Sequence, residues 1–374
     1  MSTTRTITAL TLLSFVCGCQ PTSTPTSTVT TNSTPAQVEA KPKIVDDADA
    51  IKALEALGEL KKDGDGLVIE VSFRGKEIDD SALQHLAGLK RIRSVLLNDT
   101  AITDTGLEAV GKLSTLANLD LRGCEVSNDG MAHLTGLTKL RALRLSGESG
   151  KTTVDDVGLE SIANLTSMKA LLLDYLWVSG DGLAKLDKLT ALEELYLKKT
   201  LVDDLALEGL TRFPKLKKLR LSQTQVSDAG LEHLIKLKNL EDLDLSENSL
   251  IYDDGLTHIG KMSSLKRLNL WRVAVSNFGI ENLKTLTSME WLNLDNTQLS
   301  DDGLPSLKDM KELTFLHLGS TAVSDAGLVQ LEELSKLKDL MVTRTSVTEA
   351  GVESLKKKLP NTKIQLVYLG SGEG

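Results

Sequence analysis

Residues 216–236 read LKKLRLSQTQVSDAGLEHLIK, and this stretch decides the fold. Leu219 and Leu221 alternate with Arg220, which is the pattern of a strand whose leucines face one side while the arginine faces the other. Leucines then recur at three-residue intervals from 231 to 237, a spacing typical of one face of a helix. The unit is therefore predicted to be a strand, a turn and a short helix.

The apolar pair of this unit recurs in register along the chain. Ten of the twelve intervals between first members are 24 residues; the interval after Leu143 is 28 residues, where ESGK is inserted, and the one after Leu243 is 25 residues. Such regularity is typical of a repeat architecture. The first members are Val71, Val95, Leu119, Leu143, Leu171, Leu195, Leu219, Leu243, Leu268, Leu292, Leu316, Leu340 and Ile364.

A single unit cannot bury its own leucines, so the units must stack. Stacking predicts one parallel sheet of about thirteen strands, with an inner edge of about 60 Å at ~4.8 Å per strand, and a layer of short helices behind it. Aromatic residues make up only 3% of the chain, so the core is aliphatic. Leu219→Ala is expected to cost about 2–5 kcal/mol as a cavity, whereas Arg220→Ala should leave folding nearly unchanged.

The unit resembles a leucine-rich repeat of the variant with VSDAGL-like helical segments, found in bacterial leucine-rich-repeat lipoproteins and F-box proteins. The resemblance covers residues 68–369. It implies an α/β solenoid, a horseshoe or arc, with the parallel sheet on the concave face and short helices on the convex face. It also implies that Asn, Cys or Thr after each strand ties buried backbone groups of adjacent coils, which would otherwise be costly. That position holds Thr100, Cys124, Thr200, Thr224, Asn248, Thr297, Thr321 and Thr345, whereas Leu176, Val273 and Leu369 depart from it.

The N-terminal residues are typical of an export signal. Arg5 precedes an apolar run from Ile7 to Val16, which is too short for a permanent membrane span. The run ends in VCGC at residues 16–19 and resembles the lipobox of bacterial lipoproteins, which implies lipidation of Cys19. A plain secretory signal and a membrane-retained N-terminus remain as alternatives. We expect an exported protein, either a membrane-anchored lipoprotein of a bacterial cell envelope or a secreted one.

The rest of the chain divides by composition and periodicity. The stretch after the predicted signal is rich in Ser, Thr and Pro and has few large apolar residues. Burial of apolar surface cannot offset the chain entropy of such a stretch, so it is expected to be disordered. A cap with a helix over Asp49–Lys62 is expected to cover the first coil, and a strand over Lys363–Val367 to end the array. The predicted segments are a signal peptide (1–18), a lipidated tether (19–45), an N-terminal helical cap (46–67), the repeats (68–369) and a flexible tail (370–374).

Composition argues against several classes of function. A net charge of −9 and a pI near 5.3 provide no basic field for a polyanion, so we expect no nucleic-acid partner. Three Cys cannot build a disulfide framework, and Cys124 is interpreted as a structural residue. No P-loop, GxSxG, HExxH or paired CxxC motif is present. We therefore predict no enzyme activity, no cofactor and no metal site.

Two recurring polar patterns have structural interpretations. Paired acids recur at helix starts, where one Asp can cap the helix and the second favours the positive end of its dipole. Four His share one repeat position on the coil surface and are not expected to bind metal. The acid pairs are Asp79-Asp80, Asp155-Asp156, Asp203-Asp204, Asp253-Asp254 and Asp301-Asp302, and the histidines are His85, His133, His233 and His258.

Outward strand positions predict where a ligand binds. Aromatic and Arg side chains on neighbouring strands, under about 5 Å apart, are typical of a binding hot spot. A second, smaller aromatic group and the ESGK insertion at Glu148–Lys151 are further candidates; shielding of neighbouring aliphatic residues is the alternative. The first patch is Trp271, Trp291, Phe315, His317, Arg267, Arg272 and Asp295; the second is Tyr175, Trp177 and Tyr196.

Three functional hypotheses follow. The leading one is a monomeric, membrane-tethered, non-catalytic module that binds protein, or alternatively peptide or glycan, on its concave sheet. A structural role in an envelope or surface layer is the alternative. A substrate-receptor role like that of F-box proteins is remote, because nothing before residue 68 resembles an F-box.

Overall fold

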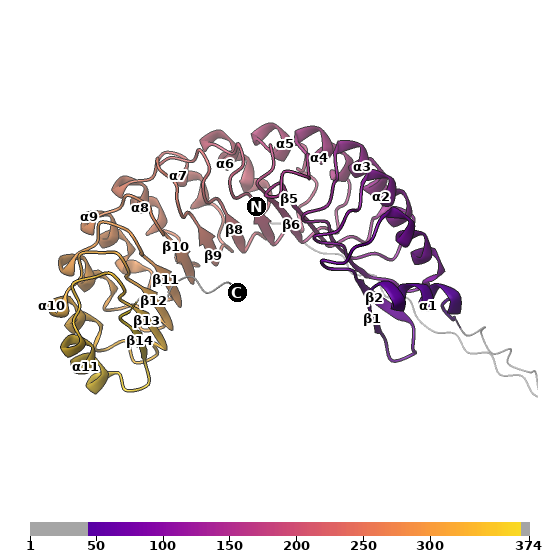
Figure 1. The fold of residues 1–374 in the computed structure, drawn as a ribbon. Coiled ribbons are helices and arrows are strands. Elements are labelled where there is room, and N and C mark those ends of the chain that lie inside the picture. The colour runs from indigo at the N-terminus through magenta and orange to yellow at the C-terminus, as the bar shows by residue number, and fades with distance from the viewer. Residues whose placement is uncertain (1–43, 368–374) are drawn as a thin grey trace, which may run out of the picture. The chain divides into compact units, whose positions relative to one another are not determined.

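A computed structural model describes residues 44–367. Cys19, the predicted signal peptide, almost all of the predicted tether and the predicted tail lie outside these residues. The described residues form one sheet of 14 strands in chain order. In Figure 1 the strands run along the inner side of this curved body and the helices along its outer side. The predicted α/β solenoid is confirmed.

Strands of three to five residues alternate with short helices. The strands are β1 (Glu59–Lys62), β2 (Val68–Ser72), β3 (Ser94–Leu96), β4 (Asn118–Asp120), β5 (Ala142–Ser146), β6 (Ala170–Asp174), β7 (Glu194–Tyr196), β8 (Lys218–Arg220), β9 (Asp242–Asp244), β10 (Arg267–Asn269), β11 (Trp291–Asn293), β12 (Phe315–His317), β13 (Asp339–Met341) and β14 (Lys363–Gln365). The α-helices are α1 (Ala48–Leu57), α2 (Asp104–Val110), α3 (Asn128–Ala132), α4 (Asp156–Ile162), α5 (Gly180–Ala184), α6 (Asp204–Gly209), α7 (Leu231–Leu234), α8 (Asp253–Ile259), α9 (Asn277–Glu281), α10 (Asp325–Leu328) and α11 (Glu349–Lys358). The 3-10 helices are η1 (Asp80–Gly88), η2 (His133–Gly136), η3 (Leu210–Arg212), η4 (Asn282–Thr285), η5 (Asp301–Leu307) and η6 (Val329–Leu331).

The predicted register is confirmed across the sheet. Leu219 pairs with Leu195 on one side and Leu243 on the other, and the same repeat position pairs from Val71 to Ile364. The longer repeats keep this register, because their extra residues lie between the strand and the following helix. A one-residue slip would turn the buried leucines to the solvent face.

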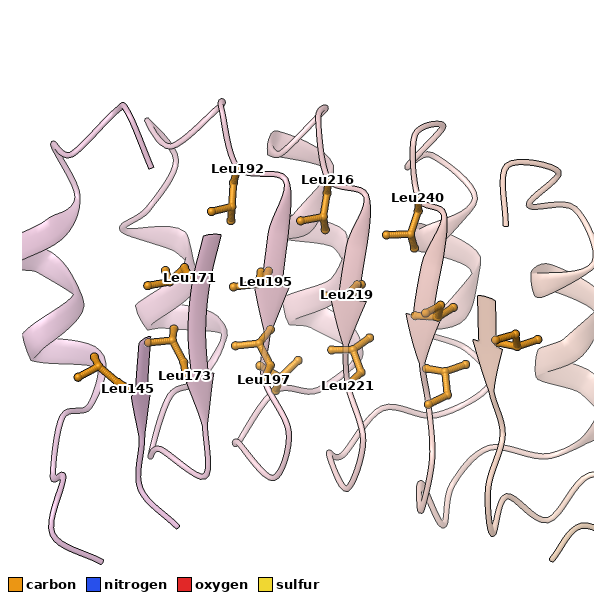
Figure 2. Packing of buried hydrophobic residues seen from close by; sticks show 14 of the residues in the cluster. Leu145, Leu171, Leu173, Leu192, Leu195, Leu197, Leu216, Leu219, Leu221 and Leu240 are labelled. Carbon is orange, nitrogen blue, oxygen red and sulfur yellow. The ribbon is translucent and has the colours of Figure 1, made fainter. Parts of the chain in front are cut away.

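The core lies between the sheet and the helices. The strand residues Leu195 and Leu219 and the helix residues Leu231 and Leu234 are at most 1% exposed. Figure 2 shows the strand leucines of successive coils in parallel rows on the helix side of the sheet. Because each buried leucine contributes about 1.5–3 kcal/mol, every coil depends on contact with its neighbours.

The polar residue after each strand ties down the turn, but mainly within its own coil. The Thr224 hydroxyl donates to the Leu221 carbonyl at 2.8 Å, three residues back. Asn248 reaches further, since its Nδ2 donates to the Leu221 carbonyl of the preceding coil at 2.8 Å. The Cys124 thiol likewise donates to Leu97 of the preceding coil at 3.1 Å. The expected tie between adjacent coils therefore holds at Asn248 and Cys124. The threonine hydroxyls mainly cap their own turn, although Thr224 also donates to the Asn248 Oδ1 of the next coil.

The N-terminal edge differs from the prediction of a helix over Asp49–Lys62. Helix α1 ends at Leu57, and Glu59–Lys62 forms β1, antiparallel to β2. Gly58 makes the change of direction possible, because a Cβ there would lie 2.5 Å from the Ser72 carbonyl oxygen. Strand β1 covers the edge that β2 would otherwise expose. At the other end, β14 is shorter than predicted and ends at Gln365.

The helix starts interlock from coil to coil. Asp79, Asp155 and Asp203 cap helices as predicted. The prediction was wrong for the pairs Asp253-Asp254 and Asp301-Asp302, because the N-cap residues there are Tyr252 and Ser300 and both acids lie in the first turn. The neighbouring acid position does something unforeseen. Its carboxylate accepts both the amide and the hydroxyl hydrogen of the Ser or Thr 23 positions later, as Asp204 does from Ser227 at 2.8 and 2.6 Å. The same bond pair joins Asp80 to Thr103, Asp104 to Ser127, Asp156 to Ser179, Asp253 to Ser276, Asp301 to Ser324 and Asp325 to Thr348.

This interlock explains the glycine of the VSDAGL segment. A Cβ on Gly230 would lie 2.8 Å from Cγ of Asp204 and closer still to its Oδ1. We call this set, Asp204 with Ser227 and Gly230 and its equivalents, the Asp–Gly clamp. It is absent between α5 and α6, where the acid position is Gly180 and the glycine position is Ala206, whose Cβ fills the space at 3.2 Å from a Cβ on Gly180. Because Gly180 has no carboxylate at the acid position, there is room for the Cβ of Ala206 at the glycine position.

Candidate ligand-binding surface

The inner face of the sheet carries the residues that flank the strand leucines, and we call it the concave surface. In strands β10, β11 and β12, the parallel register aligns Arg267, Trp291 and Phe315 in one row. All three keep part of their side chains exposed. The sheet thus brings together residues that lie 24 positions apart in the sequence.

These three side chains form a continuous stack. The Trp291 and Phe315 rings are parallel to within 6°, with centroids 4.9 Å apart. The Arg267 guanidinium lies 4.6 Å from the Trp291 ring. Because the ring separation matches the spacing of about 4.8 Å between strands, the sheet itself sets the stacking distance. We call Arg267, Trp291 and Phe315 the aromatic stack.

His317 lies at the edge of this stack, 6.4 Å from the Phe315 ring in an edge-to-face arrangement. Burial lowers the pKa of His317, and the nearby Asp295 carboxylate opposes this shift. The burial of His317 thus favours the neutral imidazole. Four of the predicted residues, Arg267, Trp291, Phe315 and His317, thus form one cluster.

The other members of the first predicted patch occupy the turns after the strands. Arg272 has a positive φ of 56° and lies over the Trp271 ring at 5.5 Å. It also pairs with Glu247 at 3.2 Å. Trp271, Arg272 and Asp295 therefore border the concave surface at the carboxyl ends of β10 and β11.

The second predicted patch divides into separate parts. Tyr196 lies on β7 under the Arg220 guanidinium, 4.2 Å from the ring centroid. Tyr175 occupies a turn with φ 62°. Trp177, 73% exposed, lies outside the strands at an isolated bridge to Asp155. The structure groups Tyr196 with the first patch instead, because it lines the same hollow of about 150 Å³ as Arg267 and Trp291.

Ion-paired side chains also line this hollow, and these pairs were not predicted from the sequence. Lys218 pairs with Glu194 at 2.7 Å, and Arg267 with Asp242 at 3.3 Å. Their signal in the sequence is opposite charge at one repeat position in successive coils: Glu194, Lys218, Asp242, Arg267. Burial raises the pKa of Asp242, and Arg267 counteracts it.

Arg220 has a larger structural role than its outward position predicts. Its guanidinium donates to Asp174 at 2.8 Å, and the Asp174 side chain is only 15% exposed. Burial raises the pKa of Asp174, and the Arg220 charge opposes this shift. Removing Arg220 would leave a largely buried carboxylate without its cation, which is costly. The expectation of a neutral Arg220→Ala variant is therefore revised to a destabilised one.

Further hollows lie elsewhere on the described residues. The ESGK insertion contributes Glu148 and Ser149 to one of about 410 Å³, which Arg122 also lines. A larger one, about 500 Å³, lies between α5 and α6, where the Asp–Gly clamp is absent, and exposes Leu205 and part of Leu201.

Among the described residues, the side chains that could react or bind a metal ion are Cys124 and the His, Asp and Glu residues. Cys124 is buried, and burial raises the pKa of its thiol to about 11. Within residues 44–367, no three His, Cys, Asp or Glu side chains are grouped so that they could hold a metal ion. Over the same range, no helix combines the length and apolar character needed to cross a membrane.

Comparison with known proteins supports the fold. No protein-family model matches the chain, and no curated protein matches it in sequence. Among solved structures, an internalin of Listeria monocytogenes superimposes with a TM-score of 0.61 at 23% identity, covering 86% of this chain and 89% of the internalin. A TDR receptor superimposes with a TM-score of 0.54 at 15% identity, covering 80% of this chain and 55% of the receptor. The chain has the leucine-rich-repeat fold that these structures share.

Proposed function

We propose that this chain is a membrane-tethered, non-catalytic module that binds a protein partner on the concave surface around β7–β12. The aromatic stack is the observation that carries the proposal. In a chain with 3% aromatic residues, two rings and an arginine stack on a partly exposed sheet face. Trp and Arg are the side chains most enriched where interfaces concentrate their binding energy.

The surroundings of the aromatic stack support this proposal. The hollow beside it is lined by Tyr196, Lys218 and Asp242, so a partner meets an aromatic anchor next to ordered polar groups. Because the stack and the ion pairs are held by neighbouring strands, little side-chain freedom remains to be lost on binding. A preorganised surface of this kind is suited to recognition.

Membrane tethering is the second part of the proposal and depends on Cys19. The predicted lipobox would place a lipid on Cys19, and the Ser/Thr/Pro-rich residues after it would act as a spacer before the repeats. Labelling cells with a radioactive fatty acid tests this directly. We expect the label to be lost in a Cys19→Ala variant; label retained by that variant would exclude lipidation at Cys19.

Crosslinking with mass spectrometry on intact cells tests the binding surface. A Trp271→Ala/Trp291→Ala variant is expected to lose the partners that the wild type captures. Trp177→Ala is the matched control, since Trp177 is exposed but lies off the concave surface. Partners unchanged in the double variant would refute the site. Recovery of self-association only, with no distinct partner, would favour the alternative of a structural envelope protein.

A further inference from the structure

A glycine interrupts the row of side chains just beyond the carboxyl ends of β10 to β13. Backbone hydrogen bonds continue the parallel register into these turns, since the Ser320 amide donates to the Thr343 carbonyl at 2.9 Å. The Asn296 amide donates in the same way to the Gly319 carbonyl at 2.9 Å. Gly319 therefore lies between two coils that do carry a side chain at this repeat position. The row consists of Trp271, Asp295, Gly319 and Thr343.

Three polar atoms from three neighbouring coils converge on Gly319. A Cβ at this position would lie 2.7 Å from Nε2 of His317 and 2.9 Å from Oδ1 of Asp295. It would also lie 3.0 Å from Oγ1 of Thr343. A side-chain carbon would push these atoms away, so the glycine allows them to gather around one point. We call His317, Asp295 and Thr343 the polar cradle.

The polar cradle offers hydrogen-bond acceptors and one negative charge. The Asp295 carboxylate and the Thr343 hydroxyl each have more than one lone pair that can accept a hydrogen bond. A neutral imidazole, the form of His317 that burial favours, has one acceptor nitrogen. Asp295 and His317 are partly buried and Thr343 is 4% exposed, so little side-chain freedom remains to be lost on binding. A small cation with several donors complements these groups.

We propose that the protein partner places a lysine ammonium over Gly319, where it donates to Asp295, His317 and Thr343. An ammonium has three donors and no acceptor, which matches three acceptors around one point. Lysine fits better than arginine, because the ammonium is a compact point charge and the guanidinium is a wider planar fork. His317 also lies 6.4 Å from the Phe315 ring, so one partner segment reaches both the polar cradle and the aromatic stack. This inference rests on the proposed function and names the chemistry of the partner residue.

A histidine NMR titration of the full chain tests the polar cradle. The chain has five His, and a His317→Gln variant assigns the His317 imidazole signal. N-acetyl-lysine methylamide is expected to shift this signal saturably at low salt. The same probe acetylated on its side-chain nitrogen keeps the stem but lacks the charge, and it should cause no shift. The signal of His85, exposed on η1, is the internal control.

Gly319→Ala tests the geometry without removing any polar group. It should weaken the lysine probe by about tenfold, the effect of losing one hydrogen bond to a charged group. Asp295→Asn should weaken the probe by about fivefold, the upper range for an exposed ion pair. Asp309→Asn, an exposed acid outside the strands, should leave the affinity unchanged.

The titration has outcomes that would overturn the inference. These are the absence of a saturable shift of the His317 signal, an equal response to the acetylated probe, and an unchanged affinity in Asp295→Asn. Circular dichroism checks that Gly319→Ala is folded. If this variant unfolds, Asp295→Asn decides the question, because it changes only one side-chain atom.

Crosslinking separates this inference from the proposed function. A carbodiimide joins a carboxylate to an amine that it contacts, so the partner should be joined to Asp295 through a lysine. Partners that the Trp271→Ala/Trp291→Ala variant loses but that Gly319→Ala retains in full would refute the lysine inference and leave the binding surface standing. Partners retained by both variants would refute both proposals. Loss of partners in both variants, together with a crosslink from Asp295 to a lysine, supports both.

Discussion

Replacing Gly230 by Ala tests the Asp–Gly clamp. In an ordinary helical position this change is stabilising by about 0.5–1 kcal/mol, because glycine loses more backbone freedom on folding. Here the added Cβ would lie 2.8 Å from Cγ and 3.0 Å from Cα of Asp204. The Cα atom belongs to the backbone, so a rotation of the Asp204 side chain cannot relieve the overlap.

The structure sets the magnitude of the expected loss. Relief requires Asp204 to move away from Ser227 and give up two hydrogen bonds, of 2.8 and 2.6 Å. Hydrogen bonds to a charged group contribute about 1.5–3 kcal/mol each. After subtracting the gain in helix propensity and allowing for partial solvent exposure, we expect Gly230→Ala to lower the free energy of unfolding by about 2–4 kcal/mol.

Urea unfolding followed by far-UV circular dichroism measures this loss. Gly209→Ala is the matched control, since Gly209 and Gly230 have nearly the same backbone angles, φ −63° and −64°, and a Cβ on Gly209 has no neighbour closer than 3.8 Å; it should be stabilising. In the Asp204→Ala background the carboxylate and its hydrogen bonds to Ser227 are already gone, so Gly230→Ala should cost much less than in the wild type, with only the contact to Cα of residue 204 left. Equal stability of the Gly230→Ala and Gly209→Ala variants, or strict additivity in the double variant, would refute the clamp.

Three further predictions follow from buried and paired groups. Leu219→Ala should cost about 2–5 kcal/mol, because the emptied site is enclosed by neighbouring coils; urea midpoints check this. In a Cys17→Ser/Cys19→Ser variant, the native Cys124 thiol should resist iodoacetamide at pH 8 and react once unfolded, because its pKa is raised to about 11. Hydrogen bonds from two lysines lower the pKa of Glu193 to about 2. Its contribution to stability should be complete above its ordinary pKa of 4.5 and be lost as pH falls toward 2; a Glu193→Gln variant lacking that pH-dependent loss confirms the assignment.

Local periodicity was sufficient for the repeat architecture. The alternating pair marks each strand, and a period shared by all coils makes equivalent residues neighbours. Trp291 and Phe315 could therefore be placed side by side before any coordinates were known, since both precede the first leucine of their strands. The prediction that Trp177 lies on the same face was wrong, because loop residues after a strand do not follow the alternation of the strand. Strand β1 was missed because its sequence, ELKK, has neither alternation nor a clear apolar face.

The spacing of the leucines by itself determined the fold, the register and the row that carries the aromatic stack. Only the tertiary structure decided which polar groups meet, such as Asp204 with Ser227 and Arg220 with Asp174. The physical reason is the difference in range and direction of the two forces. Burial of apolar area has no preferred direction and follows from residue spacing, whereas a hydrogen bond or ion pair depends on positions within tenths of an ångström that only the packed coils define.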